Sequence, residues 1–222
     1  MKTLWKTLGL KFDFQGQEHL PDTSHGGAVL AMNHISYLDF ALVGTAALPM
    51  KRYVRFMAKK EIFNNKFAGP LMRGMHHISV DRSNGSASLV AALRALRDGE
   101  IIGIFPEGTI SVSFEIKELK SGAVRLAQGA GVPVIPTIIW GSQRLWTKKV
   151  KRNLMQRGVP ITVVFGEPIY FEKGSDVEAG EAILRSAMVK MLHQVQEKYP
   201  DSHQGQRWAP VRLGGTAPAP LN

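Results

Sequence analysis

A histidine and an aspartate stand five positions apart in the segment 33–39 (NHISYLD), directly after the apolar run 28–32. A carboxylate that accepts the Nδ1 proton of an imidazole fixes the tautomer and leaves Nε2 free to take a proton from a hydroxyl. The spacing therefore predicts a general base, His34, with Asp39 as its orienting acid. Ser36-x-x-Asp39 is also a capping-box pattern, and a single histidine in a turn is often structural, so the segment alone leaves both interpretations open.

A second apolar run ends in a polar turn, in the segment 101–111 (IIGIFPEGTIS). Pro106 cannot continue a strand ladder and Gly108 can take a positive φ, so Glu107 and Thr109 are expected at the carboxyl end of a strand. Ligands of open parallel sheets bind at that edge. Alternatively, Pro-Glu-Gly is an ordinary turn with a solvated glutamate.

These side chains must be positioned by an alternation of strands and helices. Apolar periodicity predicts strands over 28–33, 53–58, 77–81, 101–105, 133–140 and 161–165. Helical periodicity predicts helices over 36–47, 85–97, 120–129 and 176–199, with Ser36 as the N-cap of the first. The alternation favours an α/β fold, a single domain with a mostly parallel central sheet flanked by helices. We expect the domain to cover 1–199 and the Gly- and Pro-containing segment 200–222 to be a disordered tail.

Composition excludes some chemistry. With 222 residues, of which 44% are hydrophobic, the chain can bury one sizeable core. It has no cysteine, which excludes disulfides, thiolate metal sites and a cysteine nucleophile.

The net charge of +10 is concentrated in two windows, 51–60 and 148–157. Each holds five basic residues and no acidic residue, and Glu61 directly follows the first window. Solvated faces, nucleic acid, and an anionic bilayer or phosphorylated ligand are alternative explanations. No run reaches the roughly 18 to 20 apolar residues that span a bilayer. Residues 1–15 could form an amphipathic helix on the membrane surface, or pack onto the domain itself.

Four blocks together resemble the 1-acylglycerol-3-phosphate O-acyltransferases (lysophosphatidic acid acyltransferases) of the glycerol-phosphate acyltransferase superfamily. The blocks are Asn33-His34 with Asp39, 78–82 (ISVDR), 105–111 (FPEGTIS) and 132–136 (VPVIP), in the order found in that family. The resemblance covers about residues 20 to 170. Two positions depart from the family pattern: Ile110 replaces a usual arginine, and His76 replaces a frequent glycine.

The resemblance implies acyl transfer from acyl-CoA, or from acyl-carrier protein, to the free hydroxyl of 1-acylglycerol-3-phosphate, which makes phosphatidic acid. It implies that Glu107, Gly108 and Thr109 shape the acceptor site and that Arg82 contacts the acceptor phosphate. Lys120, just before a predicted helix start, is a second predicted phosphate contact. We expect no metal, no cofactor beyond the acyl-donor co-substrate, no nucleic-acid partner, and a peripheral position on the anionic cytoplasmic face of the cell membrane.

Alternatives remain at this point. Because of Ile110, the acceptor could be another lysophospholipid, such as lysophosphatidylglycerol. A basic nucleic-acid-binding module is the alternative from a different class, and in it His34 would have no role. A metal-dependent phosphohydrolase fits less well, because the histidine and aspartate positions lack the close spacing of metal ligands.

Overall fold

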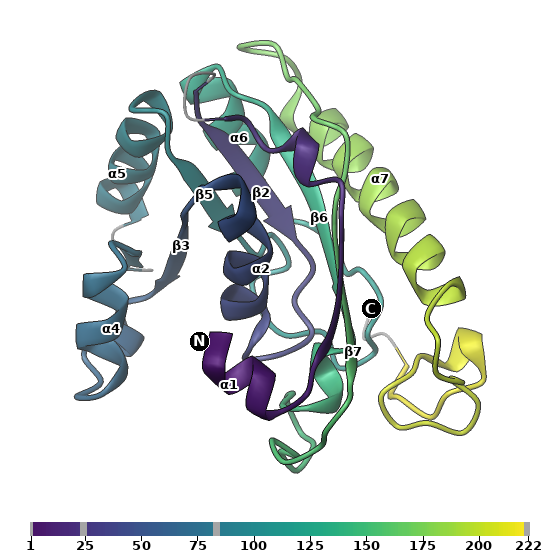
Figure 1. Cartoon of the computed structure of the whole chain (residues 1–222). Coiled ribbons are helices and arrows are strands. Elements are labelled where there is room, and N and C mark those ends of the chain that lie inside the picture. Colours follow the sequence, from purple (N-terminus) through teal and green to yellow (C-terminus); the bar gives the residue numbers. More distant parts are fainter. Residues whose placement is uncertain (1, 23–25, 82–84, 220–222) are drawn as a thin grey trace.

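The computed structural model describes residues 2–22, 26–81 and 85–219, with the backbone alone at 2–4 and 85 (Figure 1). Its core is a seven-stranded sheet in the order β1-β7-β6-β2-β5-β3-β4. The strands are β1 (Lys11–Gln15), β2 (Ala28–Met32), β3 (Val54–Lys59), β4 (Ile78–Val80), β5 (Ile101–Ile104), β6 (Val134–Trp140) and β7 (Pro160–Phe165).

The sheet is parallel from β6 to β4, whereas β7 pairs antiparallel with β6 and β1 pairs parallel with β7. The predicted single α/β domain with a mostly parallel sheet is confirmed. Every residue of β2 and β6 is buried, so the segment 132–136 leads into ordinary core. The edge strand β1 was not predicted, because its burial alternates between exposed and half-buried residues instead of forming an apolar run.

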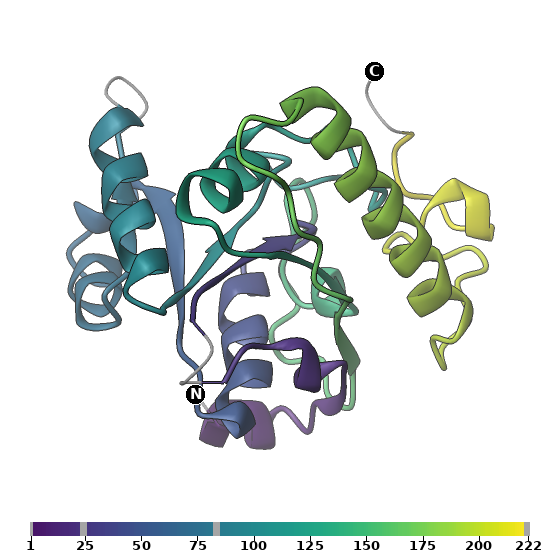
Figure 2. The same ribbon diagram turned by 90° about the horizontal axis from the view of Figure 1, so that it is seen from above.

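Helices cover both faces of the sheet: Figure 2 shows α6 and α7 on one face and α2 on the other. The α-helices are α1 (Lys2–Thr7), α2 (Asp39–Ala47), α3 (Lys60–Phe63), α4 (Ala68–Gly74), α5 (Gly85–Arg97), α6 (Gly122–Ala130) and α7 (Val177–Glu197). Short 3₁₀ turns are η1 (Gln17–His19), η2 (Leu48–Met50), η3 (Ser142–Arg144) and η4 (Val211–Leu213). All four predicted helices are present. The short helices α3 and α4 were not predicted, since one or two turns give little periodic signal.

The predicted amphipathic helix over 1–15 is wrong. The helix ends at Thr7, Gly9 follows with a φ of 60°, and Lys11–Gln15 forms β1. Trp5 and Leu8 are buried, and the indole Nε1 of Trp5 donates to Thr45 Oγ1 on α2 at 3.1 Å. This segment therefore packs onto its own domain, which was the alternative arrangement.

The prediction of a disordered tail is wrong for the described residues 200–219, and residues 220–222 lie outside them. Ala209 and Ala217 are buried, and the amide of Ala217 donates to the carbonyl of Ala209. The guanidinium of Arg144 lies over the ring of Trp208, 4.6 Å from its centroid. The glycines of this segment form turns around these contacts. Its Gly and Pro content therefore wrongly indicated disorder.

The basic window 51–60 does not form one charged surface. Arg52 is buried, and its guanidinium donates to the carbonyls of Asp22 and Gly99 at 2.7 and 2.6 Å. Arg55 forms an ion pair with Glu100. Only Arg55 and Lys59 of the window lie in β3; the burial of Arg52 and the ion pair of Arg55 leave no continuous charged face. Among the described residues, no helix combines the length and the apolar character needed to cross a bilayer.

Candidate active site

His34 and Asp39 meet at the carboxyl end of the central strand β2. The His34 Nδ1 and the Asp39 Oδ2 are 3.0 Å apart, and the Asp39 side chain is fully buried. The same Oδ2 accepts the backbone N–H groups of Ile35 and Ser36, both at 2.8 Å. An ionised carboxylate can only accept hydrogen bonds, so the His34 Nδ1 is the donor and Nε2 carries the free lone pair. The pair therefore has the geometry of an oriented base.

The other oxygen of Asp39 is held from a distant part of the chain. Ser142, in the turn after β6, donates its hydroxyl to Asp39 Oδ1 at 2.7 Å. The sequence did not indicate this residue, because it lies 103 positions away. A carboxylate held at both oxygens cannot rotate freely, and the imidazole bonded to it is fixed as well.

Ser36 is not the N-cap that its position predicted. Helix α2 starts at Asp39, its N-cap is Leu38, and no side chain caps it. The Ser36 hydroxyl instead accepts from the Leu38 N–H at 3.1 Å and donates to the Trp146 carbonyl at 2.6 Å. The turn that carries His34 is thus hydrogen-bonded to the loop after β6.

Phe105 supports the imidazole from one side. The two rings are stacked with centroids 4.0 Å apart, and the His34 side chain is 20% exposed. The base is therefore packed against an apolar wall and still reachable by a substrate. Phe105 belongs to the recognised motif, but the sequence assigned it no role.

The Glu107 carboxylate contacts the backbone of His34. Its side chain is buried; Oε1 accepts the backbone N–H of His34 at 2.9 Å and Oε2 accepts that of Lys117 at 3.2 Å. Burial raises the pKa of Glu107 to about 7, while the two N–H donors and nearby Lys117 act in the opposite direction. The interpretation of a solvated turn glutamate is wrong, and Glu107 positions the residue that carries the base.

Gly108, Thr109 and Lys120 form a polar surface next to this glutamate. Gly108 has a φ of 71°, and a Cβ there would lie 3.2 Å from the Nζ of Lys120. Thr109 and Lys120 are exposed, and Lys120 directly precedes Ser121, the N-cap of α6. A lysine that the sequence did not indicate, Lys117, donates through Nζ to the Thr109 carbonyl at 3.0 Å. The structure thus brings together all the predicted site residues that it describes.

Arg82 and Ile110 are the two remaining motif positions. Arg82 lies outside the described residues. Ile110 is buried, with 7% of its surface exposed, and is held next to Ser111, whose amide donates to the His34 carbonyl at 2.7 Å. Among the residues that the structure describes, no three His, Asp or Glu side chains gather as a metal site requires.

An apolar cavity of 760 Å³ begins one aromatic layer from the base. The rings of Phe56 and Phe105 are 6.4 Å apart, and Phe105 stacks on His34. The cavity runs between α2 and β3. Its apolar lining includes Phe40, Ala41, Leu48, Val54 and Phe56, and the charged residues Lys51, Arg52, Arg55 and Glu100 also line it. Burial lowers the pKa of His77 to about 4, with Arg55 acting in the same direction, so this ring is neutral at pH 7. The volume is in the range of a small-molecule site, about 300 to 1,000 Å³.

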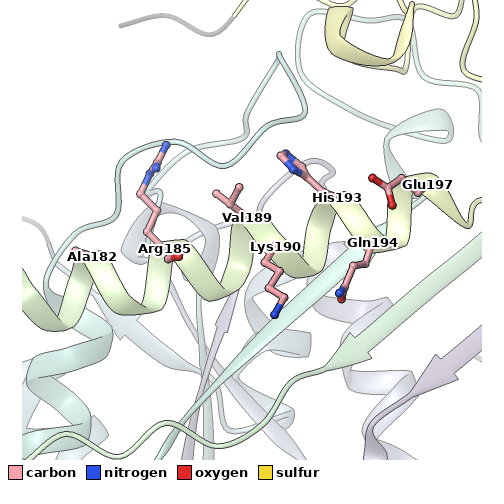
Figure 3. A pocket seen from close by; sticks show the side chains of 8 residues that line it. Ala182, Arg185, Val189, Lys190, His193, Gln194 and Glu197 are labelled. Atoms are coloured by element: carbon pink, nitrogen blue, oxygen red, sulfur yellow. The ribbon is translucent and has the colours of Figure 1, made fainter.

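A second hollow, of 670 Å³, lies along α7. Figure 3 shows that its lining side chains all come from this one helix. None of the predicted site residues lines it, so we do not assign it to the active site.

The chain is similar to known acyltransferases. The acyltransferase family model matches residues 11–140. The 1-acyl-sn-glycerol-3-phosphate acyltransferase of Bacillus subtilis is 33% identical over 179 residues, which are 80% of this chain and 82% of that protein. The enzyme of that name from Limnanthes alba is 33% identical over 171 residues, 72% of this chain and 55% of that protein.

The fold has a solved counterpart in the 1-acyl-sn-glycerophosphate acyltransferase of Thermotoga maritima. The TM-score is 0.74 at 20% identity, covering 90% of this chain and 78% of that one. Fold and site together define an acyltransferase domain. The chain belongs to the 1-acylglycerol-3-phosphate O-acyltransferase family.

Proposed function

We propose that this enzyme transfers an acyl group from a thioester, acyl-CoA or acyl-carrier protein, to the free hydroxyl of 1-acylglycerol-3-phosphate and so makes phosphatidic acid. The observation that carries the proposal is the fully buried Asp39 carboxylate, which fixes the His34 imidazole with Nε2 free. The relatives from Bacillus subtilis and Limnanthes alba carry the name of this activity.

The geometry supports a direct transfer. His34 Nε2 takes the proton of the acceptor hydroxyl as the oxygen attacks the thioester carbonyl carbon. The C–S bond then breaks, and the imidazolium returns the proton to the leaving thiolate. Asp39 stabilises the imidazolium between these steps. Such base catalysis contributes about 10² to 10⁴ in rate, and orientation of the two substrates supplies much of the rest.

The acceptor phosphate is assigned to Lys120, together with Arg82 on the strength of the family resemblance. The Lys120 ammonium lies over Gly108, the residue directly after Glu107, whose carboxylate accepts the His34 amide. A phosphate monoester there would gain a charge-assisted hydrogen bond while its hydroxyl reaches the base. Gly108 suits this place, because a side chain would occupy the space of the lysine.

The cavity between α2 and β3 is assigned to an acyl chain. The apolar part of its lining and its neutral His77 suit a hydrocarbon, and Phe56 in that lining is next to Phe105, which stacks on the base. Chain length would then be limited by the other end of the cavity, near Leu48 and Arg52. A long-chain lysolipid stays in the bilayer, since each buried methylene contributes about 0.8 kcal/mol. We therefore place the enzyme on the cytoplasmic face of the cell membrane as a peripheral protein.

The test is an assay of the purified protein with labelled palmitoyl-CoA and a panel of lysolipids. We expect the highest kcat/KM with 1-acylglycerol-3-phosphate, and His34→Ala to leave less than a few per cent of the wild-type rate with an unchanged melting profile. His193→Ala, a half-buried histidine on α7, is the matched control and should keep full activity. A full rate in His34→Ala would refute the base. Preference for lysophosphatidylglycerol, which the isoleucine at 110 makes the second candidate, would refute the acceptor.

A further inference from the structure

We infer that this enzyme docks on an anionic bilayer through two surfaces that flank the active site. One is the α3–α4 corner, residues 59–73, and the other is the β6–β7 loop, residues 146–157. The inference rests on the proposed function, because a long-chain acceptor must reach His34 from the bilayer. It goes further by naming the parts of the chain that contact lipid.

Sheet topology places both surfaces at the edge that carries the base. Strands β6, β2, β5 and β3 are neighbours in this order and mutually parallel, so their carboxyl ends share one edge. His34 follows β2 and Glu107 follows β5, in the middle of this row. The α3–α4 corner follows β3, and the β6–β7 loop follows β6. In Figure 1, α4 and the green loop before β7 both lie toward the lower end of the molecule.

The α3–α4 corner presents apolar side chains that the domain does not cover. Phe67 is 89% exposed and Leu71, one helical turn later, is 57% exposed. The corner is rigid: Asn65 Oδ1 accepts the amides of Phe67 and Ala68, and a Cβ at Gly69 would lie 2.2 Å from the Phe63 carbonyl oxygen. Phe67 is therefore held outward by a fixed turn. An aromatic ring presented in this way suits insertion into an apolar phase.

The β6–β7 loop combines apolar tips with positive charge. Met155 is 75% and Val150 46% exposed. Between 148 and 157 there are five basic residues and no acid, and all five are exposed: Lys148, Lys149, Lys151, Arg152 and Arg157. The loop adjoins the base, because the Trp146 carbonyl accepts from the Ser36 hydroxyl and the rings of Tyr37 and Trp146 are 5.0 Å apart.

An anionic bilayer matches both features at once. Exposed apolar side chains among cations favour a phase that is apolar inside and negatively charged at its surface. On the α3–α4 corner, Lys59 and Lys66 are exposed, together with one acid, Glu61. A purely protein partner or a nucleic acid would use the charges, but it would not require Phe67 and Met155 to protrude on both sides of the same site.

The experiment is co-sedimentation of the full chain with vesicles of phosphatidylcholine alone or with one third phosphatidylglycerol. We expect binding to the anionic vesicles at low salt. The double variant Phe67→Ser, Leu71→Ser should weaken it about 10-fold. Replacement of Lys148, Lys149, Lys151 and Arg152 by alanine should weaken it at least about 10-fold at low salt, and this difference should shrink in high salt.

Matched controls change the same chemistry elsewhere on the surface. Val90→Ser with Ile183→Ser removes exposed apolar side chains from α5 and α7. A quadruple alanine variant removes four exposed cations away from the proposed face: Arg94, Arg125, Lys173 and Lys190. Both controls should bind vesicles like the wild type. Equal losses in controls and test variants, or no loss in the test variants, would overturn the inference.

An activity measurement separates this inference from the proposed function. With a short-chain acceptor that stays monomeric in water, both test variants should keep the wild-type kcat/KM. With a long-chain acceptor in anionic vesicles, they should lose activity in proportion to binding. Vesicle binding without acyl transfer by the wild type would refute the proposed function alone, whereas transfer from vesicles unaffected by the variants would refute the docking face alone.

Discussion

Ser142 holds the carboxylate of Asp39, its hydroxyl donating to Oδ1 at 2.7 Å across 103 positions of sequence. The other oxygen, Oδ2, accepts from His34 and from two backbone amides. The base is therefore oriented by a turn that follows a different strand, β6.

Removing either part of this support should lower kcat. Asp39→Asn places an amide nitrogen where an acceptor is needed, which misorients the imidazole, so most activity should be lost. Ser142→Ala leaves three of the four donors of Asp39 and should reduce kcat by roughly 10-fold. Steady-state kinetics of both variants, with thermal melts as a control for folding, give the comparison. A Ser142→Ala enzyme as slow as Asp39→Asn would contradict this ranking.

Glu107→Gln should lower kcat more than it raises the acceptor KM. The carboxylate accepts from the His34 and Lys117 amides, and a glutamine side chain offers an oxygen to only one of them. A displacement of the base by about 1 Å costs on the order of 10²-fold in rate. A variant with unchanged kcat and a raised KM would show that Glu107 acts on the acceptor instead.

Lys120→Gln should raise the KM for 1-acylglycerol-3-phosphate about 10-fold, because one charge-assisted phosphate contact is lost. Arg82→Ala should raise this KM as well, and Ile110→Arg should leave it unchanged or lower it. Ile110 is buried, so each variant needs a melting curve to separate loss of fold from loss of binding. Improved use of lysophosphatidylglycerol by the Lys120 variant would be consistent with a lost monoester contact, whereas an unchanged KM would remove Lys120 from the phosphate site.

Gly44→Met should shorten the preferred acyl chain. Gly44 lines the cavity, and a Cβ there would meet its nearest neighbour, Phe56 Cε2, at 3.9 Å, an ordinary van der Waals distance. The Cβ therefore meets no clash, and the rest of the methionine side chain should occupy part of the cavity. A competition assay with acyl-CoA of 8 to 16 carbons measures the preference; Gly44→Ala is the control of minimal volume. An unaltered chain-length profile would argue against this cavity as the acyl site.

His77 should make the fold sensitive to acid. Its pKa is lowered to about 4, mainly by burial, so the folded state disfavours the proton that the unfolded chain binds below about 6.5. Its contribution is complete above pH 6.5 and is lost as the pH falls toward 4. In His77→Asn, the amide oxygen can still accept the Phe56 N–H that now bonds Nδ1 at 3.1 Å, and nothing titrates. Urea unfolding from pH 7 to 4 should show a smaller loss of stability in the variant; parallel losses would refute the assignment.

The strand ends that carry chemistry could be predicted from the amino-acid sequence. Apolar runs that stop at His34 and at Glu107 predict a parallel sheet whose carboxyl edge bears both residues, and the structure has this arrangement. The His34–Asp39 pair was also readable, since five positions across a strand-to-helix turn allow contact within one local segment. Periodicity and turn chemistry are local properties, and local sequence carries them.

The residues that hold that site in place are fixed by contacts between distant segments of the chain. Ser142, Phe105 and Lys117 contact the base or its supports from other elements, and no spacing in the sequence marks such contacts. The tertiary structure also determines how the two terminal segments pack. Trp5 donates a hydrogen bond to Thr45 on α2, and Trp208 lies against Arg144. The stability of a short helix or a Gly- and Pro-containing segment comes from the surface it packs against, and that surface exists only once the sheet has formed.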